Sequence, residues 1–349
     1  MTEVLLEHPA PHIMNRPSLT AVLLASLLAV CGGQAAAQPS AAYPTKPVRI
    51  VVTLAAGGSS DIVTRLFAQK LSEQLKQPFL VENRPGGDSI PGTMYVAKAS
   101  PDGYTLLLAN TSILTIRVSL YSKLPYDPQR DFAPISMLVT QPTVLVMHPS
   151  LAPRSVKELI ALAKVEPGKL NYATSGSGTP FHLSAELFKA QTGTELVHIP
   201  YKGFQPASVD LLSGRVQLMF ATVLDVLPHI KSGKLRPLVY TGFERHALLP
   251  DVPTTAEAGI KNAESSSFFA FVAPRGTPRE IIGTLNAEIT KIKAQPDVRQ
   301  RLLHDLGVEP GIDSLQEFEA FLRDEVVKWA KVVKASGIKM DDYHSATKR

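Results

Sequence analysis

The sequence predicts an α/β protein made of two lobes with a ligand cleft between them. After Pro47, short apolar runs alternate with segments of helical period, which is typical of mostly parallel strands joined by helices. The chain has 349 residues, 44% of them hydrophobic, which suits two lobes better than one. Two loops of small residues, 57–61 and 175–179, each follow an apolar run and open a helix. Such loops leave backbone N–H groups unpaired at one spot, which suits an anionic ligand.

The first part of the chain has the pattern of strands and helices in alternation. Gln141-Pro142 lies between two strands and is interpreted as a crossing between lobes. The expected strands are 48–54, 79–82, 104–109, 135–139 and 143–147. The expected helices are 61–74 and a short one that follows the loop 83–92 and ends near residue 99.

The rest of the chain continues the alternation, with start and stop signals for its helices. Capping boxes are expected at Ser155 with Glu158, Thr277 with Glu280, and Ser314 with Glu317. The expected helices are 155–165, 181–192, 206–212, 224–232, 277–293, 296–306 and 314–335, and the expected strands are 170–174, 196–199, 216–221, 235–240 and 268–273. Strand 268–273 is the expected return crossing. Trp329 is expected in the core, on the apolar face of the last helix.

The N-terminus has the pattern of a secretory signal peptide, residues 1–37. The apolar run 19–30 is too short to span a bilayer as a helix, Arg16 gives the positive flank, and 35–37 are three alanines. Acidic residues precede this pattern, so Met14 is a candidate start. We therefore expect export to the periplasm.

The only cysteine, Cys31, lies in this segment, so no intramolecular disulfide is expected. A competing interpretation makes Cys31 the lipidated first residue of a lipoprotein, although Val30 before it is bulkier than such processing usually accepts. The net charge of the whole chain is +5. Cleavage after residue 37 would remove one Arg and two Glu and leave +6.

Composition argues against several classes of function. The charged residues are interspersed and form no long Lys/Arg run, so no nucleic-acid partner is expected. The nine histidines lack the spacing of a metal site, so we expect no metal and no cofactor. No later segment is apolar enough to cross a membrane. A basic balance suits an anionic ligand or simply solubility.

The first loop, 57–61, places Gly57 and Gly58 where a strand turns into a helix. Glycine lets a backbone approach a ligand closely because no Cβ intervenes. Ser60 is expected to cap the helix and Asp61 to lie in its first turn. The alternative is an ordinary capped turn with no ligand.

The second loop, 175–179, reads Ser-Gly-Ser-Gly-Thr. It lacks the Lys of a P-loop and the spacing of a dinucleotide fingerprint. A nucleophile elbow has glycines two positions before and two positions after its serine, and neither Ser175 nor Ser177 has them. His182 follows closely, so a hydrolase using Ser175 or Ser177 stays an alternative, but we expect no enzyme activity.

Many stretches in one order resemble the Bug-type (TctC-like) receptors, the periplasmic substrate-binding components of tripartite tricarboxylate transporters. The similar stretches are 43–49, 57–61, 81–87, 101–105, 170–179, 182–183, 198–203, 250–254 and 273–278. The resemblance implies a type II periplasmic-binding-protein fold, with 43–143 and 267–349 in one lobe and 144–266 in the other. It also implies a cleft that holds a small carboxylate and permease subunits as membrane partners. We expect a monomer.

Several departures from the family pattern cluster near the expected cleft. A stretch that commonly reads Ala-Ile-Asn-Pro-Ser-Leu-Tyr is here Thr-Ile-Arg-Val-Ser-Leu-Tyr, residues 115–121. At Ala221-Thr222 this chain lacks an Asp that the family commonly has after the strand. At Phe268 it has phenylalanine where the family frequently has Trp. The identity of the ligand therefore does not follow from the resemblance. An amino-acid ligand would need a negative partner, for which Asp61 is the obvious candidate.

We expect one carboxylate of the ligand at the first loop and a second polar end at the second loop. The expected ligand-binding residues are Gly57, Gly58, Ser59, Ser60, Asp61, Thr111, Ser112, Ser175, Gly176, Ser177, Gly178, Thr179 and Thr222. A further alternative is a periplasmic protein that binds a ligand and signals to a membrane sensor kinase.

Overall fold

The computed structural model describes residues 43–201 and 203–339. Pro44–Arg349 forms one compact unit, and only its described residues are considered below. The predicted signal peptide, with Met14 and Cys31, lies outside the described residues. The last ten residues of the predicted range 267–349 also lie outside them.

The first lobe is built on a sheet with the strand order β2-β1-β3-β9-β4. Strand β1 (Val48–Val52) pairs in parallel with β2 (Phe79–Asn83) and β3 (Thr105–Asn110). Strand β9 (Ser266–Pro274) is antiparallel to both β3 and β4. The helices of this lobe are α2 (Ser59–Leu75), α3 (Ile90–Ala97), α4 (Arg117–Leu120), α5 (Pro128–Asp131), α10 (Arg279–Ala294), α11 (Pro296–Gln300) and α12 (Leu315–Ser336).

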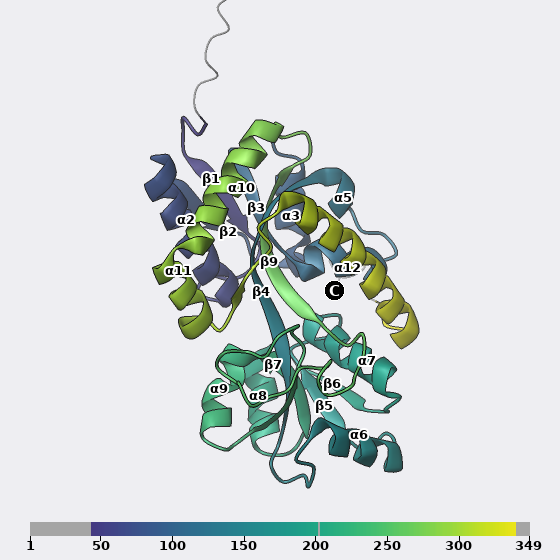
Figure 1. The fold of residues 1–349 in the computed structure, drawn as a ribbon. Helices are drawn as coiled ribbons and strands as arrows, with labels where there is room; N and C mark the ends of the chain where they lie inside the picture. Colours follow the sequence, from purple (N-terminus) through teal and green to yellow (C-terminus); the bar gives the residue numbers. More distant parts are fainter. Residues whose placement is uncertain (1–42, 202, 340–349) are drawn as a thin grey trace, which may run out of the picture. The chain divides into compact units, whose positions relative to one another are not determined.

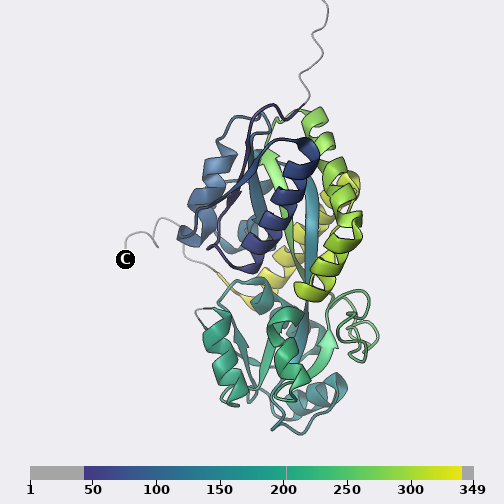
Figure 2. The same ribbon diagram turned by 90° about the vertical axis from the view of Figure 1, so that its left-hand side faces the viewer.

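The second lobe has its own mixed sheet, in which β4 pairs with β7 and β8 and β5 lies between β7 and β6. Its strands are β5 (Asn171–Thr174), β6 (Val197–Pro200), β7 (Leu218–Thr222) and β8 (Arg236–Tyr240). Its helices are α6 (Val156–Val165), α7 (Pro180–Thr192), α8 (Phe204–Leu212) and α9 (Val223–Lys231). Within this unit, Figures 1 and 2 both show the two groups of elements as separate layered halves joined by strands. The prediction of two α/β lobes is confirmed.

Strand β4 (Phe132–Met147) runs through both lobes as one continuous strand. The prediction of two separate strands around Gln141-Pro142 was therefore wrong. Pro142 is tolerated because it lies where the partners of β4 change, from β9 up to Pro142 to β7 from Thr143 onward. A proline has no N–H for the ladder, and here its neighbours supply the pairing.

Buried hydroxyl groups tie the outward and return crossings together. The Thr143 N–H donates to Thr241 Oγ1 over 2.8 Å, and Thr241 Oγ1 also contacts the Ser265 carbonyl at 2.6 Å. Because buried polar groups need partners, this network fixes where the chain passes between the lobes. We propose the lobe boundaries at 143/144 and 266/267, which fall at these crossings.

An apolar cluster joins the two lobes beside the crossings. Leu183 and Leu187 of α7 pack with Ile116, Leu120 and Trp329, the last from α12. Trp329 is fully buried, as predicted, and its Nε1–H donates to Glu325 Oε2 over 2.7 Å. Helix α7, which begins at the second loop, is therefore held against the first lobe.

The capping predictions were partly right. Ser155 and Ser314 accept the backbone N–H groups of Glu158 and Glu317, as expected. Thr277 does not cap α10, because its hydroxyl donates to the Pro274 carbonyl and the helix begins at Arg279. Ser60 does not cap α2, because the helix begins at Ser59 and its N-cap residue is Gly58.

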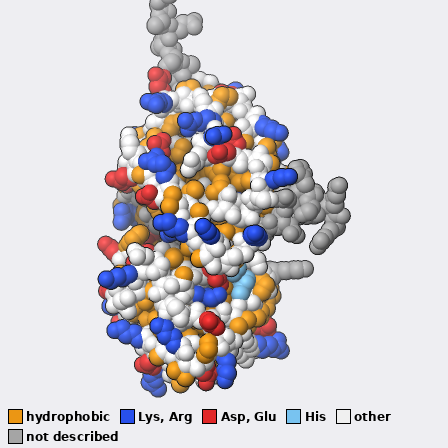
Figure 3. Space-filling view, turned by 90° about the vertical axis from the view of Figure 1, so that its right-hand side faces the viewer, with side chains coloured by type: hydrophobic (Ala, Val, Ile, Leu, Met, Phe, Trp, Pro, Cys, Tyr) orange, Lys and Arg blue, Asp and Glu red, His pale blue; other side chains and the backbone are white. Residues whose placement is uncertain are grey.

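Charged side chains of both signs are spread over the face drawn in Figure 3, mixed with hydrophobic ones. This agrees with the interspersed charges of the sequence. None of the helices in residues 43–201 and 203–339 combines the length and the apolar character that crossing a bilayer requires.

Candidate functional site

A cavity of about 360 Å³ lies where segments of both lobes meet, a size within the usual range for small-molecule pockets. The first lobe supplies the end of β1, the loop after β2 and the segment after β3, and the second lobe supplies the second loop. The lining residues are Thr53, Leu54, Ala55, Pro85, Gly86, Asp88, Ser89, Asn110, Ser112, Arg117, Leu120, Tyr121, Ser177, Gly178 and Thr179.

The second loop enters this cavity as a rigid turn at the start of α7. Thr179 is the N-cap residue of α7, and its hydroxyl accepts the His182 N–H over 3.4 Å. The Gly178 N–H donates to His182 Nδ1 over 3.1 Å. Gly176 has φ 149, which is accessible to glycine but strained for other residues. Ser177, Gly178 and Thr179 line the cavity, whereas Ser175 and Gly176 are not among its lining residues.

His182 supports the loop from behind. Its ring stacks on that of His198 with centroids 3.7 Å apart, and His198 Nε2 lies 2.7 Å from Thr174 Oγ1. Burial, reinforced by the neighbouring His198, lowers the pKa of His182 to about 4. The ring is therefore neutral at pH 7, and its Nδ1 is used to hold Gly178 rather than to activate a serine.

None of the residues of the first loop, 57–61, is among the lining residues of this cavity. Gly57, with φ 84, and Gly58 and Ser59 are exposed, whereas Ser60 and Asp61 are buried. Asp61 Oδ2 accepts from Arg65 Nε over 2.9 Å and from the Gly57 N–H over 3.0 Å. These contacts, the Arg65 bond above all, lower the pKa of Asp61 to about 2.

Asp61 also accepts from Asn83 through its second oxygen, over 2.9 Å. Its carboxylate thus closes the loop internally. The hypothesis that Asp61 receives a ligand ammonium finds no support in this geometry.

The three remaining predicted residues have different surroundings. Ser112 lines the cavity. Thr111 is fully buried, and its hydroxyl accepts the Phe268 N–H over 2.8 Å, which joins the end of β3 to β9. Thr222 is the N-cap of α9, where its hydroxyl contacts Asp225. The cavity therefore brings together Ser112, Ser177, Gly178 and Thr179 of the predicted set.

The structure adds charged residues that the sequence prediction missed. Arg117 begins α4, is 6% exposed and lines the cavity. Its Nη2 donates to Asp88 Oδ1 over 2.8 Å, and the Tyr121 hydroxyl donates to Asp88 Oδ2. Arg117 was visible in the sequence only as a departure from the family pattern, and Asp88 only as part of a loop.

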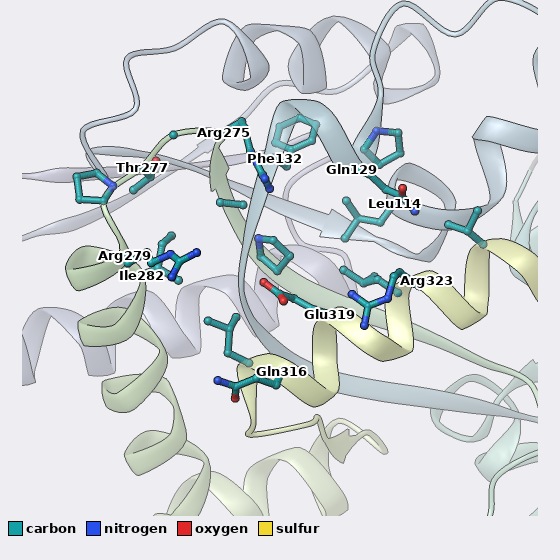
Figure 4. A pocket seen from close by; sticks show the side chains of 18 residues that line it. Leu114, Gln129, Phe132, Arg275, Thr277, Arg279, Ile282, Gln316, Glu319 and Arg323 are labelled. Carbon is teal, nitrogen blue, oxygen red and sulfur yellow. The ribbon is translucent and has the colours of Figure 1, made fainter.

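A second, larger cavity of about 890 Å³ lies in the first lobe and involves neither loop. Figure 4 shows it between α12 and the turn before α10, with Arg275, Arg279 and Arg323 around Glu319. All four of these charged side chains are exposed. The smaller cavity differs from it in having a buried cation, Arg117, and lining residues from both lobes.

Two α/β lobes joined by crossing strands, with a cavity lined by both of them, define a periplasmic-binding-protein type of receptor. Residues 63–338 match the model of the family described as "Tripartite tricarboxylate transporter family receptor". The chain therefore belongs to this family. Members of this family are periplasmic binding proteins that act as solute receptors.

Relatives of known name support this assignment. The chain is 38% identical to Protein BugT of Bordetella pertussis over 328 residues, 94% of this chain and 100% of that protein. It is similar to the structure of R. palustris Rpa4515 with adipate, at 37% identity and a TM-score of 0.74, covering 85% of this chain and 99% of that one. It is also similar to MatC from Rhodopseudomonas palustris with bound malate, at 31% identity and a TM-score of 0.70, covering 83% and 100%. The Bug-type resemblance and the type II fold are thereby confirmed.

Proposed function

We propose that this protein captures a small carboxylic acid in the cavity between its lobes and delivers it to the permease subunits of a tripartite tricarboxylate-type transporter. The observation that carries the proposal is the cavity itself, in which the buried cation Arg117 faces the same space as residues 177–179. Two similar structures, Rpa4515 with adipate and MatC with malate, hold dicarboxylic acids.

The lining groups suit an acid rather than a neutral ligand. The start of α7 contributes the positive end of a helix dipole, and Ser112 and Ser177 contribute hydroxyl groups. A charge-assisted hydrogen bond adds about 1.5–3 kcal/mol net to binding. A few such contacts, less the costs of association, reach the roughly −8 kcal/mol of a micromolar site.

Delivery to a membrane partner is supported by family membership and by the predicted signal peptide 1–37, which would place the mature protein in the periplasm. Lobe closure around the acid would exclude water and present a changed surface to the permease. Of the predicted site residues, we propose that Ser112, Ser177, Gly178 and Thr179 contact the ligand directly.

Isothermal titration calorimetry of the protein from Gln38 onward, with succinate, malate, adipate and hexanoate, tests this function. Ser177 is exposed at the cavity wall, so Ser177→Trp would fill the cavity without disturbing the core. We expect the wild type to bind at least one acid and Ser177→Trp to lose at least about tenfold in affinity.

The matched control is Ser100→Trp, in an exposed turn before β3, at the opposite end of that strand from Asn110. It should bind as the wild type does. Equal affinity in all three proteins would place the ligand outside this cavity. No binding of any acid would contradict the proposed function.

A further inference from the structure

We propose that Arg117 binds a carboxylate group of the ligand, and that Asp88 positions the Arg117 guanidinium and sets how much negative charge the cavity accepts. The inference rests on the proposed function, because it concerns the same cavity. It assigns specificity to two residues on different segments of the first lobe.

Arg117 has hydrogen-bonding capacity that the described protein leaves unused. A guanidinium carries five N–H donors. Asp88 accepts from one of them, and the Tyr126 hydroxyl is a further hydrogen-bonding neighbour, whereas within residues 43–201 and 203–339 the Nη1 atom is buried with no hydrogen-bond partner. A buried donor without a partner is costly and uncommon. A ligand carboxylate at the cavity wall would supply the acceptors that this guanidinium lacks, and the two groups match in geometry.

The backbone of Asp88 has a positive φ, a conformation that is strained for a residue with a side chain. The four residues Gly86, Gly87, Asp88 and Ser89 all have positive φ, with φ 50 at Asp88 and φ 63 at Ser89. Glycine would adopt these angles without strain, whereas other residues lose stability there. The carboxylate of Asp88 contacts both Arg117 and the Tyr121 hydroxyl. We infer that the strain is retained because this contact orients Arg117.

The two residues balance one another in charge. Of the described residues that line the cavity, Arg117 is the one cation and Asp88 the one anion. An entering carboxylate therefore shares Arg117 with Asp88, and a ligand with a second carboxylate meets the negative charge of Asp88 at close range. Asp88 should accordingly weaken the binding of dianions more than that of monoanions.

Three substitutions separate the charge of this pair from its shape. Arg117→Asn removes the positive charge and the guanidinium donors. Arg117→Lys keeps the charge but loses the planar pair of donors. Asp88→Asn keeps the shape and an acceptor oxygen but removes the charge.

The experiment is calorimetry of these three variants at pH 7 with succinate and adipate as dianions and hexanoate as a monoanion. Arg117→Asn should weaken every acid that the wild type binds by about ten- to hundredfold. Arg117→Lys should recover part of that loss. Asp88→Asn should tighten the dianions relative to hexanoate several-fold, a change in selectivity that a purely structural role would not produce.

Arg323→Asn is the control, because it removes an exposed arginine from the larger cavity and should leave affinity unchanged. Circular dichroism and thermal unfolding establish that each variant is folded. If Arg117→Asn does not fold, Arg117→Lys decides: unchanged affinity and unchanged selectivity would overturn the inference.

The failure of this inference is distinguishable from that of the proposed function. Unchanged affinity in folded Arg117→Asn, together with lost binding in Ser177→Trp, would overturn the role of Arg117 and leave the cavity as the ligand site. No acid bound by the wild type would overturn both. A loss of affinity in Arg323→Asn alone would move the ligand to the larger cavity and overturn both as well.

Discussion

At the scale of single residues, the second loop depends on a neutral histidine. His182 Nδ1 can accept the Gly178 N–H only when it carries no proton. Burial lowers its pKa to about 4 in the folded protein, whereas an unperturbed histidine has a pKa near 6.5. Between these values the unfolded chain binds more protons than the folded one. The contribution of His182 to the free energy of unfolding is therefore complete above about pH 6.5 and is lost as the pH drops toward 4.

We expect the free energy of unfolding to fall by up to about 3 kcal/mol between pH 7 and pH 4 from this group, measured by urea denaturation at a series of pH values. His182→Asn keeps an acceptor oxygen near the same place and cannot titrate, so its slope should be shallower. Part of the slope should remain, because burial also lowers the pKa of His198. Identical slopes in the wild type and His182→Asn would show that His182 is not the group responsible.

The sequence predicted one loop that lines the cavity, but not the charged residues beside it. Residues 175–179 stand out because small residues precede a helical pattern, and the structure places 177–179 in the cavity wall. Asp88 and Arg117 are 29 positions apart and meet only through the folding of the first lobe. No local pattern indicates such a pair, which is why Arg117 was noticed as a departure and not as a site residue.

At the scale of elements, α7 connects the ligand loop to the first lobe. Leu187 of α7 is 4% exposed and packs in the cluster with Trp329 of α12. Leu187→Ala should lower the free energy of unfolding by about 2–4 kcal/mol, because it leaves a cavity among apolar side chains. Chemical denaturation measures this difference.

The comparison for Leu187 is Val209→Ala in α8, whose side chain is 60% exposed and should change stability by less than about 0.5 kcal/mol. Similar small losses in both variants would mean that α7 does not pack against the first lobe as described.

Helices with local signals were predictable, and β4 was not. Ser155 and Ser314 cap the expected helices because the capping box is encoded within four residues. Thr277 has the same pattern but donates to Pro274, since the chain before it turns out of β9. For β4, Pro142 suggested a break, and only the change of partner strands at that point explains why the strand continues.

At the scale of the whole described unit, the fold was predictable from alternation and length, but the meeting of the lobes was not. The strands cross where Thr143, Thr241 and Ser265 form a buried hydroxyl network. The cavity lies between the lobes, so ligand binding and lobe closure are coupled in this account. The cavity itself is formed by stretches far apart in the sequence, so no single stretch indicates it.

The most direct test of the central claim is a crystal structure of the protein grown with an acid that calorimetry shows to bind. We expect the acid between the lobes, with one carboxylate at about 2.7–3.1 Å from the Arg117 guanidinium and polar atoms against Ser177–Thr179. An acid found instead among Arg275, Arg279 and Arg323, with the cavity at Arg117 empty, would contradict it.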